Sequence, residues 1–237
     1  MYNKEEQLRD QICDIGKRIY MKDMVAANDG NVSAKLTEGV FICTPTGVSK
    51  GFMKPDMLCK INEKGELIEE NKYGLTPSSE MKMHLKIYEK RKDVNSVVHA
   101  HPQHATAYAI CNIPLDKQIM PEATISLGIV PIAKYGAPST NELSESLLPF
   151  LEEYDAVLLA NHGAVTYGKD VTAAYYKMES LEFYAKLLYL SNNIGKPIEF
   201  SYERVEQLLD LKDNYYKPAG KHPGAKCLIN LQANFKK

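Results

Sequence analysis

The stretch Val94-Asn-Ser-Val-Val-His-Ala-His-Pro102 puts two histidines at the end of an apolar run, and a second run, Asp155-Ala-Val-Leu-Leu-Ala160, is closely followed by a third, His162. Both runs are predicted to be strands. Because residues i and i+2 of a strand point to the same face, His99 and His101 should project together, and the following proline should end the strand. Three imidazoles from neighbouring strand ends can supply three of the four ligands of a tetrahedral zinc site and leave the fourth position open.

A carboxylate that could join these histidines lies in Thr76-Pro-Ser-Ser-Glu-Met-Lys-Met-His84. Threonine is a good N-cap and proline suits the first helical position, so we expect a helix to start near Pro77, with Glu80 in or just past its first turn. There Glu80 either interacts favourably with the helix dipole or serves as a fourth metal ligand and general base, and the spacing leaves both open. His84 and His104 are interpreted as residues that pack beside the site.

Three short turns of small residues are candidates for binding an anion: Gly30-Asn31, Thr46-Gly47 and Ser78-Ser79. Backbone N–H groups in such turns, and at a helix N-terminus, bind phosphate well. Each turn alone has the composition of an ordinary loop, but the three together predict an anion pocket near Glu80. With the histidines, they suggest metal-assisted chemistry on a phosphorylated or polyhydroxylated substrate.

Length, charge and cysteine usage limit the class of protein. The 237 residues fit one domain, 1–237, with a core of its own, and the formal net charge of -1 gives no field that would attract nucleic acid or an acidic membrane. Five cysteines without a CxxC pair indicate a reducing compartment. The charged N-terminus has no signal-peptide pattern, and no apolar stretch approaches the ~20 residues of a membrane span. We therefore expect a cytoplasmic protein with no nucleic-acid or membrane partner.

Hydrophobic periodicity predicts the other elements. Helices are expected at 4–27, 103–111, 141–153, 171–193 and 201–214, and strands at 39–44, 59–62, 66–69, 94–101, 155–160 and 164–167. The stretch 117–135 holds two short apolar segments. Residues 217–237 are rich in Lys, Pro and Gly and are expected to be partly mobile.

Five motifs occur together in an order and spacing that resemble the class II aldolase/adducin family: Gly30-Asn-Val-Ser33, Thr44-Pro-Thr-Gly47, Pro77-Ser-Ser-Glu80, His99-Ala-His-Pro102 and Asn161-His-Gly163. The similarity covers roughly residues 5–216 and is greatest to the family's L-fuculose-1-phosphate aldolases. The resemblance implies an α/β fold, a three-layer α/β/α sandwich around a mainly antiparallel sheet, which the order of predicted elements alone does not determine. It also implies a homotetramer with sites at the subunit interfaces.

The resemblance also implies roles for individual residues. His99, His101 and His162 correspond to zinc ligands, although imidazole ligands also suit cobalt, manganese and nickel. Glu80 corresponds to a residue that ligates zinc at rest and then acts as acid and base. The phosphate pocket would consist of Gly30, Asn31, Thr46, Gly47, Ser78 and Ser79. Tyr215 falls where these aldolases carry a functional tyrosine, but the adjacent Tyr216 makes the register ambiguous.

The sequence departs from the family pattern at one place. Those aldolases carry a tyrosine, contributed by the neighbouring subunit, before the strand near residue 130. Here the stretch reads Ile119-Met-Pro-Glu-Ala-Thr-Ile-Ser-Leu-Gly128 and contains no tyrosine. Glu122 is its only ionisable group, and it is either a solvated surface carboxylate or the group that contacts the aldehyde end of a substrate.

The implied reaction is the reversible, zinc-dependent cleavage of a ketose 1-phosphate into dihydroxyacetone phosphate and an aldehyde. Two other reactions of the family remain open: 4-epimerisation of ribulose 5-phosphate and dehydration of a thio-sugar phosphate. The motif Thr44-Pro-Thr-Gly47 favours the aldolase. A non-catalytic scaffold like the adducin head domains is the alternative of another class, and the complete set of three histidines and Glu80 argues against it.

Overall fold

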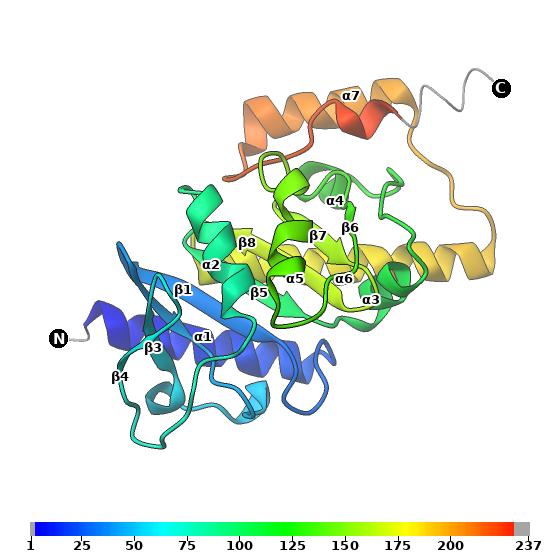
Figure 1. Ribbon diagram of the computed structural model, residues 1–237. Helices are drawn as coiled ribbons and strands as arrows, with labels where there is room; N and C mark the ends of the chain where they lie inside the picture. The colour runs from blue at the N-terminus through cyan, green and yellow to red at the C-terminus, as the bar shows by residue number, and fades with distance from the viewer. Residues whose placement is uncertain (1–2, 230–237) are drawn as a thin grey trace.

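A computed structural model describes residues 3–229 and contains one eight-stranded sheet, in the order β4-β3-β2-β1-β5-β8-β7-β6 (Figure 1). Neighbouring strands are antiparallel except for β6 and β7, which are parallel, so the mainly antiparallel sheet implied by the resemblance is confirmed. The strands are β1 (Asn31–Thr37), β2 (Val40–Cys43), β3 (Cys59–Asn62), β4 (Leu67–Glu69), β5 (Ser96–Ala100), β6 (Ile132–Ala133), β7 (Ala156–Leu159) and β8 (Gly163–Gly168).

Helices occupy most of the remaining chain. They are α1 (Lys4–Met21), α2 (Met81–Lys90), α3 (Gln103–Ile110), α4 (Pro121–Ser126), α5 (Asn141–Ser146), α6 (Val171–Ile194) and α7 (Tyr202–Leu211). Short 3-10 turns follow at η1 (Lys50–Phe52), η2 (Pro55–Met57) and η3 (Leu148–Phe150), and α7 continues into a π-helical turn, η4 (Lys212–Tyr216). In the described part of the chain, no helix has both the length and the apolar character needed to cross a membrane.

The central strands bury both of their faces. Successive strand residues point to opposite sides of a sheet, and here Val97 and Val157 belong to one apolar cluster while Val98 and Leu158 belong to another. The first cluster is completed by α2 and α5, and the second by α1, α3, α4 and α6. In Figure 1, α2 and α5 lie in front of the sheet and α6 lies behind it. Burial on both faces explains why β5 and β7 are almost continuously apolar in sequence.

The predicted helix 4–27 is wrong in its C-terminal part, because α1 ends at Met21. Asp23 adopts a left-handed conformation with φ of 55°. The Met24 amide donates to Ile19 O at 2.9 Å and the Asp23 amide to Tyr20 O at 3.1 Å, which is the hydrogen-bond pattern of a Schellman motif. Met24 is itself buried, so the apolar periodicity continues past the end of the helix.

The predicted helix start at Pro77 is also wrong, because α2 begins at Met81 with Glu80 at its N-cap position. Residues 76–78 pair instead with a distant segment. The Thr46 amide donates to Thr76 O at 2.9 Å and the Ser78 amide to Thr44 O at 3.2 Å. A non-local pairing therefore overrides the local capping signal, and Ser78 and Ser79 lie in the turn before the helix.

The other differences occur farther along the chain. The predicted helix 141–153 stops at Ser146 and is followed by η3, which contains Pro149, a residue that cannot continue a helix by donating an N–H. Part of the stretch predicted to be mobile packs instead: His222 donates to Thr124 O at 2.8 Å, and Cys227 is buried against α7. Residues 230–237 lie outside the described part of the chain, and the single domain 1–237 stays a prediction.

A buried charge cluster should stabilise this fold. Asp155 accepts hydrogen bonds from Arg91 Nη2 and Lys177 Nζ, both at 2.6 Å, and joins the end of α2 to β7 and α6. Asp155→Ala leaves two cations without their shared acceptor, so the free energy of unfolding, measured by chemical denaturation, should fall by about 3–5 kcal/mol. Glu89→Ala, which removes an exposed partner of Lys86, is the control and should change little. Equal free energies of unfolding for the two variants would contradict this prediction.

Candidate metal centre

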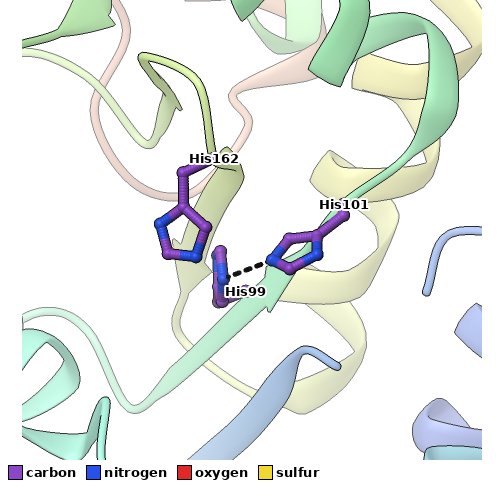
Figure 2. Close-up of side chains that lie close together, drawn as sticks. All are labelled: His99, His101 and His162. Carbon is purple, nitrogen blue, oxygen red and sulfur yellow. Dashed lines mark hydrogen bonds between the residues drawn. The ribbon is translucent and has the colours of Figure 1, made fainter. Parts of the chain in front are cut away.

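Three histidines from two chain segments converge on one point (Figure 2). His99 lies in β5, His101 directly follows that strand, and His162 lies in the turn between β7 and β8. Each offers one ring nitrogen, and these nitrogens all lie within 4.8 Å of one another. The Nε2 atoms of His99 and His101 are 3.1 Å apart. The group could hold a metal ion.

The carboxylate of Glu80 lies beside this group of histidines. Its Oε2 lies 3.3 Å from His99 Nε2, and its Oε1 lies 3.4 Å from His162 Nε2. Metal–nitrogen bonds of about 2.0–2.1 Å in tetrahedral geometry place ligand atoms roughly 3.3–3.4 Å apart. The distances from Glu80 to His99 and His162 are therefore close to those around a tetrahedral ion such as zinc.

Neighbouring groups hold the ligands in the form that a metal requires. His99 Nδ1–H donates to Ala164 O at 2.9 Å, which leaves the Nε2 lone pair free. His101 Nδ1 lies 3.6 Å from Asp29 Oδ2, and Asn31 Nδ2 donates to Glu80 Oε2 at 2.8 Å. A hydrogen bond thus orients His99 and another orients Glu80, while Asp29 lies near His101.

Burial lowers the pKa of two of the three imidazoles. The pKa of His99 is lowered well below its usual value, first because burial disfavours the charged ring and then because His101 and His162 lie close by. The pKa of His101 is lowered for the same reasons, burial being the larger. Glu80 Oε1 is buried and has no hydrogen-bond partner among residues 3–229, as expected of a carboxylate oxygen that binds an ion.

Two glycines allow the segments to approach. A Cβ on Gly163 would lie 2.5 Å from Ala100 O and 2.7 Å from His101 Cδ2. Gly30 has a φ of +72°, and a Cβ there would lie 2.9 Å from His99 O. A larger residue at either position would push the turn away from the end of β5.

The candidate phosphate turns lie at two connected places. The pairing of residues 44–46 with 76–78 brings Thr46-Gly47 beside Ser78-Ser79, and the bridge between Pro45 and Pro77 belongs to the same pairing. Gly30-Asn31 lies at the start of β1, where Asn31 is opposite His99 in the register. Asn31 Oδ1 is buried and unpartnered among the described residues. The grouping of all three turns into one pocket stays a prediction.

The structure does not bring Tyr215 or Glu122 to the histidines of the same chain. Tyr215 is exposed in η4, with its ring 5.0 Å from that of Tyr216. Glu122 lies in the first turn of α4, at a cavity of about 470 Å³ that Lys22 and Glu182 also line. Within residues 3–229, no hydrogen bond or ion pair joins either residue to the three histidines.

The remaining two histidines named in the sequence have packing roles. His84 is buried, its Nδ1 lies 2.7 Å from Ser33 Oγ, and burial lowers its pKa to about 3. His104 Nδ1 lies 2.7 Å from Glu182, which also accepts from the His104 and Ala105 amides and so caps α3.

Two residues near the site were not found by sequence reasoning. Asp29 contacts His101, and its only signal was its place before Gly30-Asn31. Lys50 is buried, and its Nζ donates to Asn28 O at 2.7 Å. A lone lysine in a loop is ordinarily exposed, so no sequence pattern marked it.

Comparisons with known proteins agree with this geometry. The family model of the class II aldolase and adducin N-terminal domain matches residues 10–189. An L-fuculose phosphate aldolase of Methanococcus maripaludis is 36% identical over 186 residues, covering 78% of this chain and 96% of that protein. A 3-oxo-tetronate 4-phosphate decarboxylase of Pectobacterium atrosepticum is 33% identical over 193 residues, covering 79% and 86%.

The solved structures agree as well. An L-fuculose 1-phosphate aldolase superposes with a TM-score of 0.77 at 28% identity, covering 85% of this chain and 94% of the other. The family model and the relatives span most of this chain, and the range that the family model matches contains the three histidines and Glu80. The chain therefore belongs to the class II aldolase and adducin family.

Proposed function

We propose that this protein is a zinc-dependent aldolase that reversibly cleaves a ketose 1-phosphate, similar to L-fuculose 1-phosphate, into dihydroxyacetone phosphate and an aldehyde. The observation that carries the proposal is the convergence of three imidazoles and the Glu80 carboxylate on one point where a metal ion could bind. The aldolase relatives support the substrate class. Another divalent transition metal could replace zinc, since the ligand types do not distinguish them.

A second candidate reaction is the decarboxylation of a 3-oxo-tetronate 4-phosphate, which the relative at 33% identity favours. Loss of carbon dioxide from such a 3-oxo acid leaves the same three-carbon phosphorylated carbanion as cleavage of a ketose 1-phosphate. The two reactions differ only in the departing part of the substrate. Residues that handle the retained fragment would serve both.

The chain's own residues can be assigned steps in this chemistry. When bound, a divalent metal supplies Lewis-acid stabilisation of negative charge on oxygens beside the breaking bond. Asn31 holds the Glu80 carboxylate toward the imidazoles through its 2.8 Å hydrogen bond. Glu80 would move the proton at the carbon that becomes nucleophilic. The phosphate turns would fix the substrate so that this carbon faces Glu80.

The proposal includes an assembly. A homotetramer with the family's three-layer fold would place residues 119–128 of one subunit beside the site of its neighbour. Glu122 would then contact the aldehyde end, and Tyr215 would reach a site from the C-terminal segment. Their separation from the histidines within one chain is compatible with such an arrangement. A cytoplasmic location stays part of the proposal.

One assay separates the two candidate reactions. Purified protein is given a panel of ketose 1-phosphates and a 3-oxo-tetronate 4-phosphate, and release of dihydroxyacetone phosphate and of carbon dioxide is followed separately. An aldolase releases dihydroxyacetone phosphate from the ketose phosphates without carbon dioxide. Carbon dioxide release from the 3-oxo acid alone would replace the first proposal with the second.

The metal assignment predicts about one divalent ion per chain, held by three histidines and Glu80. His101→Ala removes one ligand and should abolish binding, measured by elemental analysis of protein purified without chelator. His104→Ala is the matched control, since His104 interacts with Glu182 instead, and it should keep its metal. Wild-type protein without metal would count against the enzyme proposal as a whole.

Glu80→Gln tests the acid and base role. The amide keeps the shape and can still accept from Asn31, so the fold should persist while turnover falls roughly 10²–10⁴-fold. Glu89→Gln alters an exposed glutamate farther along α2 and should leave turnover unchanged. Near-normal turnover of Glu80→Gln would mean that Glu80 has no acid or base role and only interacts with the helix terminus.

Ser79→Asp tests the phosphate pocket. A carboxylate in this turn would repel the substrate phosphate, so KM for phosphorylated substrates should rise sharply. Ser79→Ala removes only the hydroxyl that hydrogen-bonds Ser139 and should have a smaller effect. If unphosphorylated ketoses are cleaved as well as phosphorylated ones by the wild type, the pocket assignment is wrong.

A further inference from the structure

A lysine is buried between two of the candidate phosphate turns. Lys50 opens η1 with only 1% of its surface exposed. Its Nζ donates to Asn28 O at 2.7 Å and to Val48 O at 2.8 Å. Gly16 permits this burial, because a Cβ there would lie 2.8 Å from Lys50 O and push η1 away from α1.

The ammonium group has no counter-ion within the described chain. No carboxylate of residues 3–229 forms an ion pair with Lys50, and Asp29 acts on it only through its electric field. Asp29 is itself half-exposed and lies 3.6 Å from His101. Burial lowers the pKa of Lys50 to about 8, so the group is still mostly charged at neutral pH. An unpaired buried cation is costly unless something else balances it.

The two carbonyls that Lys50 binds lie next to two of the candidate phosphate turns. Asn28 lies two residues before Gly30-Asn31, and Val48 directly follows Thr46-Gly47. The ammonium therefore ties together two turns whose amides were assigned to the phosphate. Its positive field also reaches the metal centre, where it helps to lower the pKa of His99. An ammonium carries three donors and the carbonyls use two, which leaves one available.

We propose that Lys50 is the cation of the phosphate pocket: it braces the turns at 28–31 and 46–48, and its charge is balanced by a dianionic phosphate group. The inference rests on the proposed function, because it assigns a residue to that same site. Lys50 is a positioning residue and takes no part in bond cleavage. The pocket should consequently select phosphate monoesters by their two negative charges and discriminate against isosteric monoanions.

The test measures binding and does not depend on turnover. Full-length wild type, Lys50→Met and Lys54→Met are compared by calorimetric titration with inorganic phosphate and with dihydroxyacetone phosphate, at measured metal content. Methionine is an unbranched side chain one atom shorter than lysine, and it carries no charge and no donor. Lys50→Met should bind both probes at least about 10-fold more weakly while keeping its metal. Lys54 is exposed, so Lys54→Met should bind like the wild type.

The outcomes separate this inference from the proposed function. If folded Lys50→Met binds phosphate as tightly as the wild type, Lys50 is not the cation of the pocket and the inference is overturned. If the metal-loaded wild type itself binds no phosphate, the pocket proposed for these turns fails, and the inference fails with it.

A wild-type measurement covers the case in which Lys50→Met does not fold. Dihydroxyacetone phosphate carries two negative charges at neutral pH and the corresponding sulfate monoester carries one. The phosphate should bind at least about 10-fold more tightly than the sulfate. Equal binding of the two esters would overturn the role of Lys50 in charge selection.

Discussion

The hydrogen bond from Asn31 to Glu80 joins the two parts of the molecule on which the site depends. Asn31 begins β1 opposite His99, and Glu80 stands at the N-cap of α2. The same strand and helix meet again where Ser33 Oγ lies 2.7 Å from His84 Nδ1 and 2.8 Å from Tyr88 Oη. Because strand residues two apart and helix residues four apart advance by similar distances, α2 lies in register with β1. That register sets where the carboxylate meets the imidazoles.

Much of the site could be predicted from the sequence because its signals are local. The strand period alone puts His99 and His101 on one side, and Asn161-His-Gly163 follows an apolar run that could only be a buried strand or helix. Two helix boundaries could not be predicted, one because a non-local pairing decided it and the other because a buried side chain follows the end of the helix. Residues 76–78 pair with 44–46, and the buried Met24 continues the apolar pattern beyond α1. Glu80 therefore reaches the metal centre from an N-cap and not from within a helical turn.

Lys50 illustrates a different limit of sequence reasoning. Its residue type indicates a solvated side chain, and only the packing of η1 against α1 makes it a buried cation. Burying it removes a charge from water, and two backbone carbonyls compensate for only part of that loss. A chain that keeps such a residue between two turns retains a positive field there, which an anionic group can satisfy. Within residues 3–229 no carboxylate forms an ion pair with Lys50, a feature that a sequence alone does not reveal.

The relatives of two activities indicate where specificity should be sought. Aldol cleavage and decarboxylation leave the same phosphorylated fragment, so the three histidines, Glu80 and the candidate phosphate turns need not differ between the two proposed reactions. The difference must lie in residues that meet the departing aldehyde or carboxylate. A departing carboxylate would be repelled by a nearby glutamate, whereas the hydroxyl groups of an aldehyde could donate to it. If Glu122 of a neighbouring subunit faces that end of the substrate, its charge favours an aldehyde over a carboxylate, and so favours the aldolase reaction.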